Sequence, residues 1–248
     1  MRLFVHQLRA EQLLFWRSRE ASIFIFVFPL LLFILLASVY NGTISGHPAR
    51  DVLLAGMLGY GAANTAFAGL GVSLVIRREL GILKRIRSTP LPAPTYLVAH
   101  LTSTLIVFVL QSIVLVAVGR ALFGTRVPHQ LPALAVVLVG GAAVFAAMGF
   151  AAAALIRSAE GSSAVLTTIL LPMAFLSGSF GPTRRYPQVL RAVGDVLPLK
   201  YLLELVDGVY LEHRAIWHFA GAASVLAAWG IAGLAIAATR FGWEPRSA

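Results

Sequence analysis

Long runs of apolar residues alternate with short polar segments along this chain of 248 residues. Six runs contain no Asp, Glu, Lys or Arg and are long enough to cross the roughly 30 Å hydrocarbon core of a bilayer. The predicted spans are Ala21–Tyr40, Val52–Ile76, Tyr96–Gly119, Leu131–Ile156, Ala164–Phe180 and Ile216–Thr239. The runs are too long and too uniformly apolar for the strands of a membrane barrel. The pattern therefore predicts an all-α integral membrane protein that forms one transmembrane domain over residues 1–248.

Composition agrees with this fold class, because 58% of the residues are hydrophobic and only 12% are charged. The net charge of +10 lies in the segments between the spans, where Lys and Arg set membrane orientation rather than bind nucleic acid. With the N-terminus inside, the first two inner segments hold 9 basic residues and the first outer segment holds 1. We therefore expect both termini in the cytoplasm. The first span is longer than the core of a signal peptide, so we expect it to be retained.

The first 20 residues predict a helix that lies in the membrane interface. Phe4, Leu8 and Phe15 gather on one side of this helix, and Arg2 and Arg9 lie largely on the other. Glu11 and Gln12 interrupt the pattern. The alternative interpretation is a disordered basic tail.

Residues 77–95, between the second and third spans, predict a short basic amphipathic helix. Leu80, Leu83 and Ile86 have helical spacing, and Pro90 ends the helix. The basic residues around this apolar stripe are Arg78, Lys84, Arg85 and Arg87. Charge alone favours an anchor on anionic lipid over a docking element for a cytosolic partner.

Residues 181–215 form the longest segment outside the spans, and two apolar series within it predict two short helices. Pro187 can begin the first helix, and Pro198 separates it from the second. We expect these helices to dip into or lie on the outer face of the membrane. The alternative is an external loop with no special role.

Several kinds of chemistry are disfavoured by the sequence. It has no G-x-x-x-x-G-K-[ST] loop for ATP, no cysteine, and no ionisable Asp, Glu, Lys or Arg inside a predicted span. Ser177 with His218 is a weak candidate for an intramembrane protease pair, because Ser in membrane helices usually serves packing. His213 and His218 are poorly spaced for a metal site on one helix face. We therefore assign no catalytic residue and no metal ligand.

Polar and small residues inside the spans have two competing explanations. Small residues recur every four positions in the second span, as Gly61 and Thr65 do, and in the fourth span, as Ala143 and Ala147 do. Such stripes let helices pack closely. Asn64, at the centre of the second span, is equally consistent with a substrate path and with a hydrogen bond between helices.

Two motifs carry a resemblance to a known family. Residues 78–91 read RELGILKRIRSTPL, which is similar to the signature E-x-G-[TI]-L-[KE]-R-[LI]-R-x-[TS]-P-L of the permease subunit of ABC-2 type transporters, the type V exporter fold. Residues 175–180 read FLSGSF, followed by Pro182 and by LPLKY at 197–201, which resembles a second, weaker motif of that family. The resemblance covers essentially the whole chain.

This resemblance implies a fold, partners and roles for particular residues. The fold has an N-terminal elbow helix over residues 1–20, a cytoplasmic coupling helix over 77–90 and re-entrant helices over 181–215. The partners are a separate ABC ATPase subunit, which binds ATP and Mg, and a second permease copy in a homodimer or heterodimer. The residues assigned to coupling are Glu79, Gly81, Lys84, Arg85 and Arg87. The residues assigned to the translocation path are Asn64, Phe67, Thr168 and Met173.

The resulting hypothesis is an ATP-driven exporter subunit that is not itself an enzyme. Its expected location is the bacterial plasma (inner) membrane, because abundant Ala, Val, Leu, Arg and Gly are typical of a GC-rich bacterial source. The alternatives are a membrane-embedded enzyme with its site in residues 181–215 and a structural membrane anchor.

Overall fold

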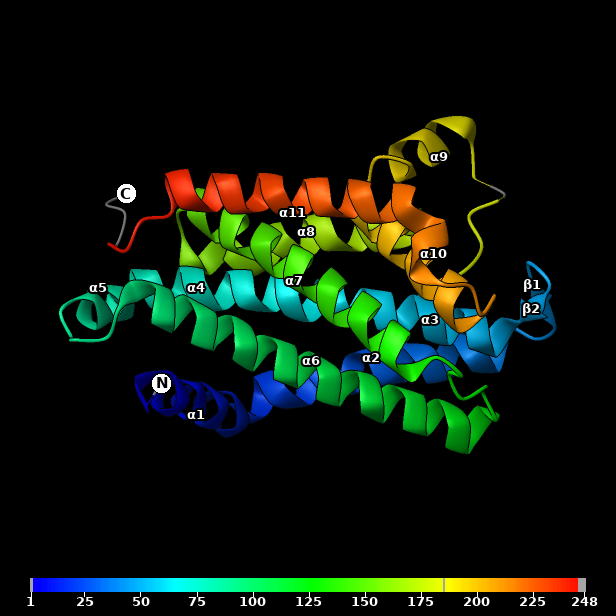
Figure 1. The fold of residues 1–248 in the computed structure, drawn as a ribbon, viewed down its shortest axis with the longest axis horizontal. Helices are drawn as coiled ribbons and strands as arrows, with labels where there is room; N and C mark the ends of the chain where they lie inside the picture. Colours follow the sequence, from blue (N-terminus) through cyan, green and yellow to red (C-terminus); the bar gives the residue numbers. More distant parts are fainter. Residues whose placement is uncertain (1, 185, 245–248) are drawn as a thin grey trace.

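The computed structural model describes residues 2–184 and 186–244 as an elongated bundle of helices (Figure 1). Within these residues, six helices are long and apolar enough to cross a membrane, as the hydrophobic pattern predicts. They are α2 (Arg19–Val39), the continuous run of α3 (Ala49–Ala62), η1 (Ala63–Gly69) and α4 (Leu70–Glu79), α6 (Ala93–Phe123), α7 (Leu131–Leu155), α8 (Ala159–Ser177), and η2 (Ile216–Phe219) with α11 (Ala220–Arg240).

The remaining elements are shorter. They are α1 (Arg2–Arg17), α5 (Ile82–Arg87), α9 (Gln188–Gly194), α10 (Pro198–Tyr210) and the antiparallel strands β1 (Thr43–Ile44) and β2 (His47–Pro48). The strands depart from the all-helical expectation. They form because Ser45 and Gly46 both have positive φ, 54° and 86°, as in the tight turns that join short antiparallel strands.

The ends of the spans differ from the sequence prediction by a few residues. The α8 helix begins at Ala159 rather than Ala164, because Glu160 suits the positive end of the helix dipole and need not be excluded from it. It ends at Ser177 rather than Phe180, because Gly178 adopts φ +93° and caps the helix.

The second span contains a π-helical segment, η1, that the sequence pattern does not reveal. Gly149 of α7 lies directly against it. A Cβ atom at Gly149 would lie 2.7 Å from the carbonyl oxygen of Ala66 and 2.9 Å from that of Phe67. The lack of a side chain at Gly149 therefore lets the backbone of α7 reach the altered carbonyls of the second span.

Small residues set the contact between α7 and α11 in the middle of the bundle. A Cβ atom on Gly233 would lie 2.9 Å from the backbone of both Ala147 and Met148. A Cβ atom on Gly230 would lie 3.1 Å from the side chain of Val144. The predicted small-residue stripe of the fourth span thus includes a residue, Ala147, at a close helix contact.

The segment before the last span forms two helices, α9 and α10, divided at Pro198 as the two apolar series predict. The α10 helix buries one face against the bundle through Leu199, Leu202 and Val206. Leu202 fits against Gly141 of α7, where a Cβ atom would lie only 2.4 Å from its side chain.

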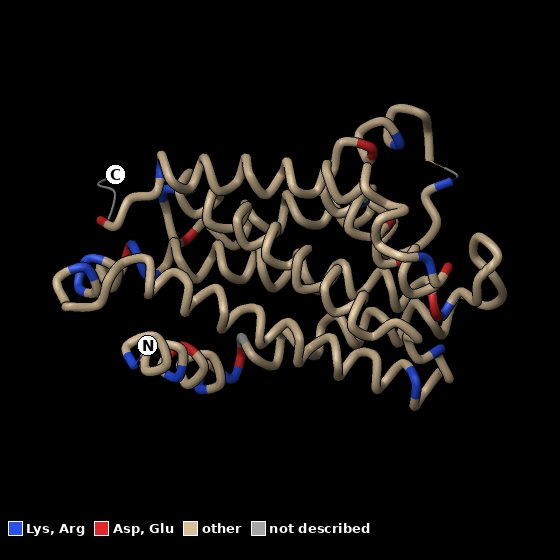
Figure 2. The backbone as a smooth tube through the Cα atoms, viewed as in Figure 1, with Lys and Arg blue, Asp and Glu red and all other residues tan. Residues whose placement is uncertain are grey.

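Both ends of the described chain lie at the same end of the bundle as α5, and the β-hairpin and α9 lie at the other end (Figure 1). The charged residues gather toward these two ends and leave the middle of the bundle apolar (Figure 2). This distribution suits helices whose central parts lie in lipid.

Candidate functional site

The region predicted as a coupling helix consists of two pieces rather than one helix over 77–90. The α4 helix continues through Glu79, and the chain turns at Leu80 and Gly81 before α5 begins at Ile82. Gly81 has φ +70°, in the left-handed region that favours glycine. The α5 helix packs through Leu83, which is fully buried. The predicted coupling residues Lys84, Arg85 and Arg87 are all exposed.

The last two residues of α4 bind the backbone of the turn between α7 and α8. Arg78, which is only 1% exposed, donates from Nη1 to the carbonyl oxygen of Ala153 at 2.6 Å and from Nη2 to that of Ile156. The carboxylate of Glu79 accepts a hydrogen bond from the backbone N–H of Ala159. The sequence pattern grouped Arg78 with the other basic residues around the apolar stripe, and the structure buries it.

A second set of polar contacts joins α1, α4 and α6. Glu11 of α1 is 2% exposed and forms an ion pair with Arg77 of α4, in which Nη1 lies 2.8 Å from the carboxylate. The same Nη1 donates to the hydroxyl of Tyr96 at 2.8 Å. The Nδ1 atom of His100 on α6 lies 2.9 Å from Oε2 of Glu11. We call Glu11, Arg77, Tyr96 and His100 the elbow cluster.

The elbow cluster keeps Glu11 ionised. Burial by itself raises the pKa of a carboxyl group, but the hydrogen bond from His100 and the nearby charge of Arg77 outweigh it and hold the pKa of Glu11 at about 2. At neutral pH the α1 helix is therefore tied to the second and third spans by a buried carboxylate.

Sequence reasoning did not identify the elbow cluster, although a signal for it was present. Glu11 and Gln12 are the residues that interrupt the amphipathic pattern of the first helix, and both contact α6. Gln12 donates from Nε2 to Oγ of Ser103 at 2.8 Å. His100 gave no signal, because one histidine in an apolar run carries no periodicity.

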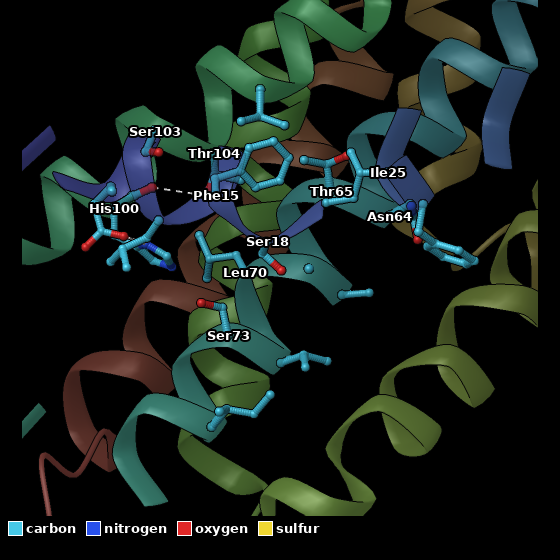
Figure 3. A pocket seen from close by; sticks show the side chains of 18 of the residues that line it. Phe15, Ser18, Ile25, Asn64, Thr65, Leu70, Ser73, His100, Ser103 and Thr104 are labelled. Atoms are coloured by element: carbon cyan, nitrogen blue, oxygen red, sulfur yellow. Dashed lines mark hydrogen bonds and ion pairs between the residues drawn. The ribbon is translucent and has the colours of Figure 1, made fainter. Parts of the chain in front are cut away.

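A cavity of about 510 Å³ lies beside the elbow cluster. Its lining comes from α1, α2, η1, α4, α6 and α8, and Figure 3 shows His100 and Ser103 at one end and Asn64 at the other. Between these ends the lining is mixed, with apolar side chains such as Phe15 and Leu70 beside hydroxyl side chains such as Ser18 and Ser73. A cavity whose apolar lining is interrupted by polar side chains suits an amphiphilic molecule.

The four predicted path residues lie in different surroundings. Asn64 is half-buried and lines the cavity. Thr168 is exposed on α8, whereas Phe67 and Met173 are buried, 4% exposed each. The neighbouring Thr167 lines the cavity instead of Thr168. Within this one chain the structure therefore does not bring the four residues together.

The neighbour of Asn64, and not Asn64 itself, supplies a hydrogen bond between helices. Thr65 donates from Oγ1 to Oε1 of Gln111 on α6 at 2.8 Å, and both side chains are buried. This contact links the second and third spans, and it leaves the Asn64 side chain at the cavity.

Residues 181–215 are where the alternative interpretation places an enzyme site. Among the described residues, no group of three or more His, Cys, Asp or Glu side chains could hold a metal ion. His213 lies beside His129, with ring centroids 5.0 Å apart, and not in a cluster with carboxylates.

Six long apolar helices, with the amphipathic α1 before them and the basic α5 at one end, define a multi-pass membrane protein. The family model of the ABC-2 type transporter matches residues 2–211. A search of curated proteins finds no match. The chain belongs to the ABC-2 type transporter family, and the part that is matched is the family's membrane domain, without a nucleotide-binding domain.

Proposed function

We propose that this chain is the membrane subunit of an ATP-driven exporter and that it works with a separate ABC ATPase subunit. ATP and Mg would bind to that partner, because the chain has no phosphate-binding loop of its own. ATP drives alternating access by binding more tightly to one state of the complex than to the other.

The exposed basic surface of α5 is the observation that carries this proposal. Lys84, Arg85 and Arg87 point away from the bundle while Leu83 anchors the helix to it. Three cations on a short, anchored helix suit a complementary protein surface. In this proposal Glu79 and Gly81 set the position of α5, and the three basic residues contact the ATPase.

A second permease copy completes the proposed transport unit, in a homodimer or a heterodimer. The α8 helix carries exposed polar side chains at Ser163, Thr167 and Thr168, within a helix that is apolar enough to cross the membrane. Hydroxyl groups are poorly matched to lipid, so they favour a face that meets the second copy or a water-filled path. Asn64, Phe67, Thr168 and Met173 remain the proposed path residues.

The proposed orientation places both termini and α5 in the cytoplasm, with α9, α10 and the β-hairpin outside. The excess of Lys and Arg in the first inner segments supports this orientation. We propose the bacterial plasma (inner) membrane as the location and export as the direction of transport.

Affinity purification from native membranes in mild detergent tests the proposal. The chain is expected to retain an ATPase subunit in a fixed ratio, which mass spectrometry and an ATPase assay would detect. Replacing Lys84, Arg85 and Arg87 by Ala is expected to weaken this binding about tenfold, since each exposed ion pair contributes on the order of 0.5 kcal/mol.

The matched control replaces Arg2, Arg9 and Arg17 by Ala. These residues are equally basic and exposed, and they lie on another amphipathic helix at the same end of the bundle. The control is expected to keep the ATPase. A wild-type chain that purifies without any ATPase would overturn the proposed function.

A further inference from the structure

We propose that Arg78 and Glu79 form a joint that transmits movement of α5 to the turn between α7 and α8. This inference rests on the proposed function, and it assigns the two residues as positioning residues within the chain rather than as contacts of the ATPase.

Arg78 holds the end of α7. The last carbonyls of any helix lack partners within that helix, and the helix dipole makes this end negative. The guanidinium group of Arg78 donates to the carbonyl oxygens of Ala153 and Ile156, which lie at this end. Because Arg78 is only 1% exposed, water cannot replace these contacts easily.

Glu79 holds the beginning of α8. The first N–H groups of a helix also lack partners, and this end of the dipole is positive. Ser158 precedes the helix but makes no side-chain capping hydrogen bond. The carboxylate of Glu79 accepts from the N–H of Ala159, the first residue of α8, and so performs that function from another helix.

The two residues are consecutive, and their charges match the two helix ends that they meet. Arg78 meets the negative end of α7, and Glu79 meets the positive end of α8. The turn between these helices is therefore fixed to the last turn of α4. Only Leu80 and Gly81 separate α4 from α5. A displacement of α5 is therefore passed to α4, α7 and α8 together.

Substitutions at Glu79 distinguish a role within the joint from a direct contact with the ATPase. Gln retains an oxygen that accepts the N–H of Ala159, whereas Ala removes the acceptor. We expect Glu79→Ala to keep the ATPase bound and to reduce the permease-dependent change in its ATPase rate at least about fivefold, the low end of typical coupling between sites. Glu79→Gln is expected to recover most of that change.

Arg78→Lys provides a second variant that preserves the charge but replaces the two separate donor nitrogens with one. Its permease-dependent change in ATPase rate is expected to lie between those of the wild type and Glu79→Ala. An ammonium group cannot reproduce the two divergent contacts of a guanidinium group. The matched controls are Glu20→Ala and Arg17→Lys, whose side chains are exposed elsewhere near the same end. Both are expected to behave as the wild type.

A distance measurement between two spin labels tests the joint directly. The chain contains no cysteine, so Ser88→Cys on the α5 side and Ser158→Cys in the turn can be spin-labelled selectively. Both serines are exposed. We expect the distance between the labels in the purified complex to stay the same after trapping with ATP and vanadate, and to shift or broaden when Glu79→Ala is added.

The outcomes distinguish the two proposals. A wild-type chain without an ATPase partner overturns the proposed function. A complex in which Glu79→Ala, like the controls, retains the wild-type ATPase response and the wild-type label distance overturns the joint. Equal loss of ATPase binding in Glu79→Ala and Glu79→Gln also overturns it, because that result assigns the Glu79 charge to docking.

Discussion

The C-terminal end of α7 and its middle are held by different kinds of contact. At its cytoplasmic end, by the proposed orientation, Arg78 donates hydrogen bonds to the backbone of α7. In its middle, α7 meets α11 through Ala147 and Gly233 without any charged group. The same helix is thus fixed by directional bonds at one end and by close packing further along.

The two kinds of contact differ in how much displacement of their atoms they tolerate. A buried, charge-assisted hydrogen bond favours one geometry and costs free energy as soon as its atoms separate. Close packing of small residues has no preferred donor or acceptor and depends only on the space between two backbones. The end near α5 is therefore suited to transmit a displacement, and the middle is suited to let helices shift while they stay packed.

The largest effect is expected when the directional contact is removed. Arg78→Ala leaves two carbonyl oxygens without their charged donor and opens a cavity, so it is expected to lower the free energy of unfolding by about 4 kcal/mol. Thermal unfolding in detergent, followed by the fluorescence of the four tryptophans, measures the loss. Arg17→Ala, at an exposed position, should leave the midpoint unchanged, and an equal effect of both variants would contradict the assignment.

The elbow cluster is a second set of directional contacts, and its contribution to stability depends on pH. The pKa of Glu11 is lowered from 4.5 to about 2 by His100 and Arg77 in spite of burial. The ionised carboxylate therefore contributes about 3 kcal/mol above pH 4.5, and this contribution is lost as the pH falls through 2. Glu11→Gln should remove it at neutral pH and flatten the dependence of the unfolding midpoint on pH between 5 and 2.

The exposed Glu20 offers the control for that experiment. Glu20→Gln should retain both the midpoint at neutral pH and the acid-induced loss of the wild type. If Glu11→Gln loses stability between pH 5 and 2 as steeply as the wild type does, another group causes the acid transition.

The packed middle of the bundle should respond to added volume rather than to lost charge. Gly233→Ala places a Cβ atom 2.9 Å from the α7 backbone, where no side chain can move aside, and is expected to cost about 2 kcal/mol. Gly221→Ala on the same helix meets no heavy atom within 4 Å and should cause no loss. Equal midpoints for both variants in thermal unfolding would show that the two helices separate easily.

The smallest effect is expected at the turn between α4 and α5. A side chain at Gly81 would meet nothing within 4 Å, so only its φ of +70° opposes substitution. Gly81→Ala is expected to cost about 1 kcal/mol, and Gly81→Asn less, because Asn tolerates the left-handed region. The same unfolding assay ranks them, and the reverse order would argue against a conformational role for this glycine.

Much of the fold follows from the hydrophobic pattern. Six uncharged apolar runs predict the six candidate spans, since backbone groups in lipid must be bonded within a helix. Pro198 divides α9 from α10 for a local reason, because it lacks the N–H group that a continuing helix needs. The π-helical segment η1 was not predictable, because no proline or other local signal marks it and it lies against the backbone of α7 at Gly149.

The candidate site was predictable only in part. The basic motif that contains Lys84, Arg85 and Arg87 is visible in the sequence, and these side chains are exposed in the structure. Arg78 lies in the same motif and is buried. Periodicity within one helix cannot distinguish them, because the partners of Arg78 are carbonyl oxygens some 75 residues further along the chain.

The sequence by itself determined that this protein is a multi-pass helical membrane protein with a basic amphipathic segment after its second span. These properties depend on composition and spacing within about 20 residues, which is the length that a bilayer requires of a helix. The tertiary structure alone decided which charged residues would be buried. Burial of Glu11 and Arg78 depends on donors and acceptors contributed by other helices, and only the packing of those helices brings them within hydrogen-bond distance.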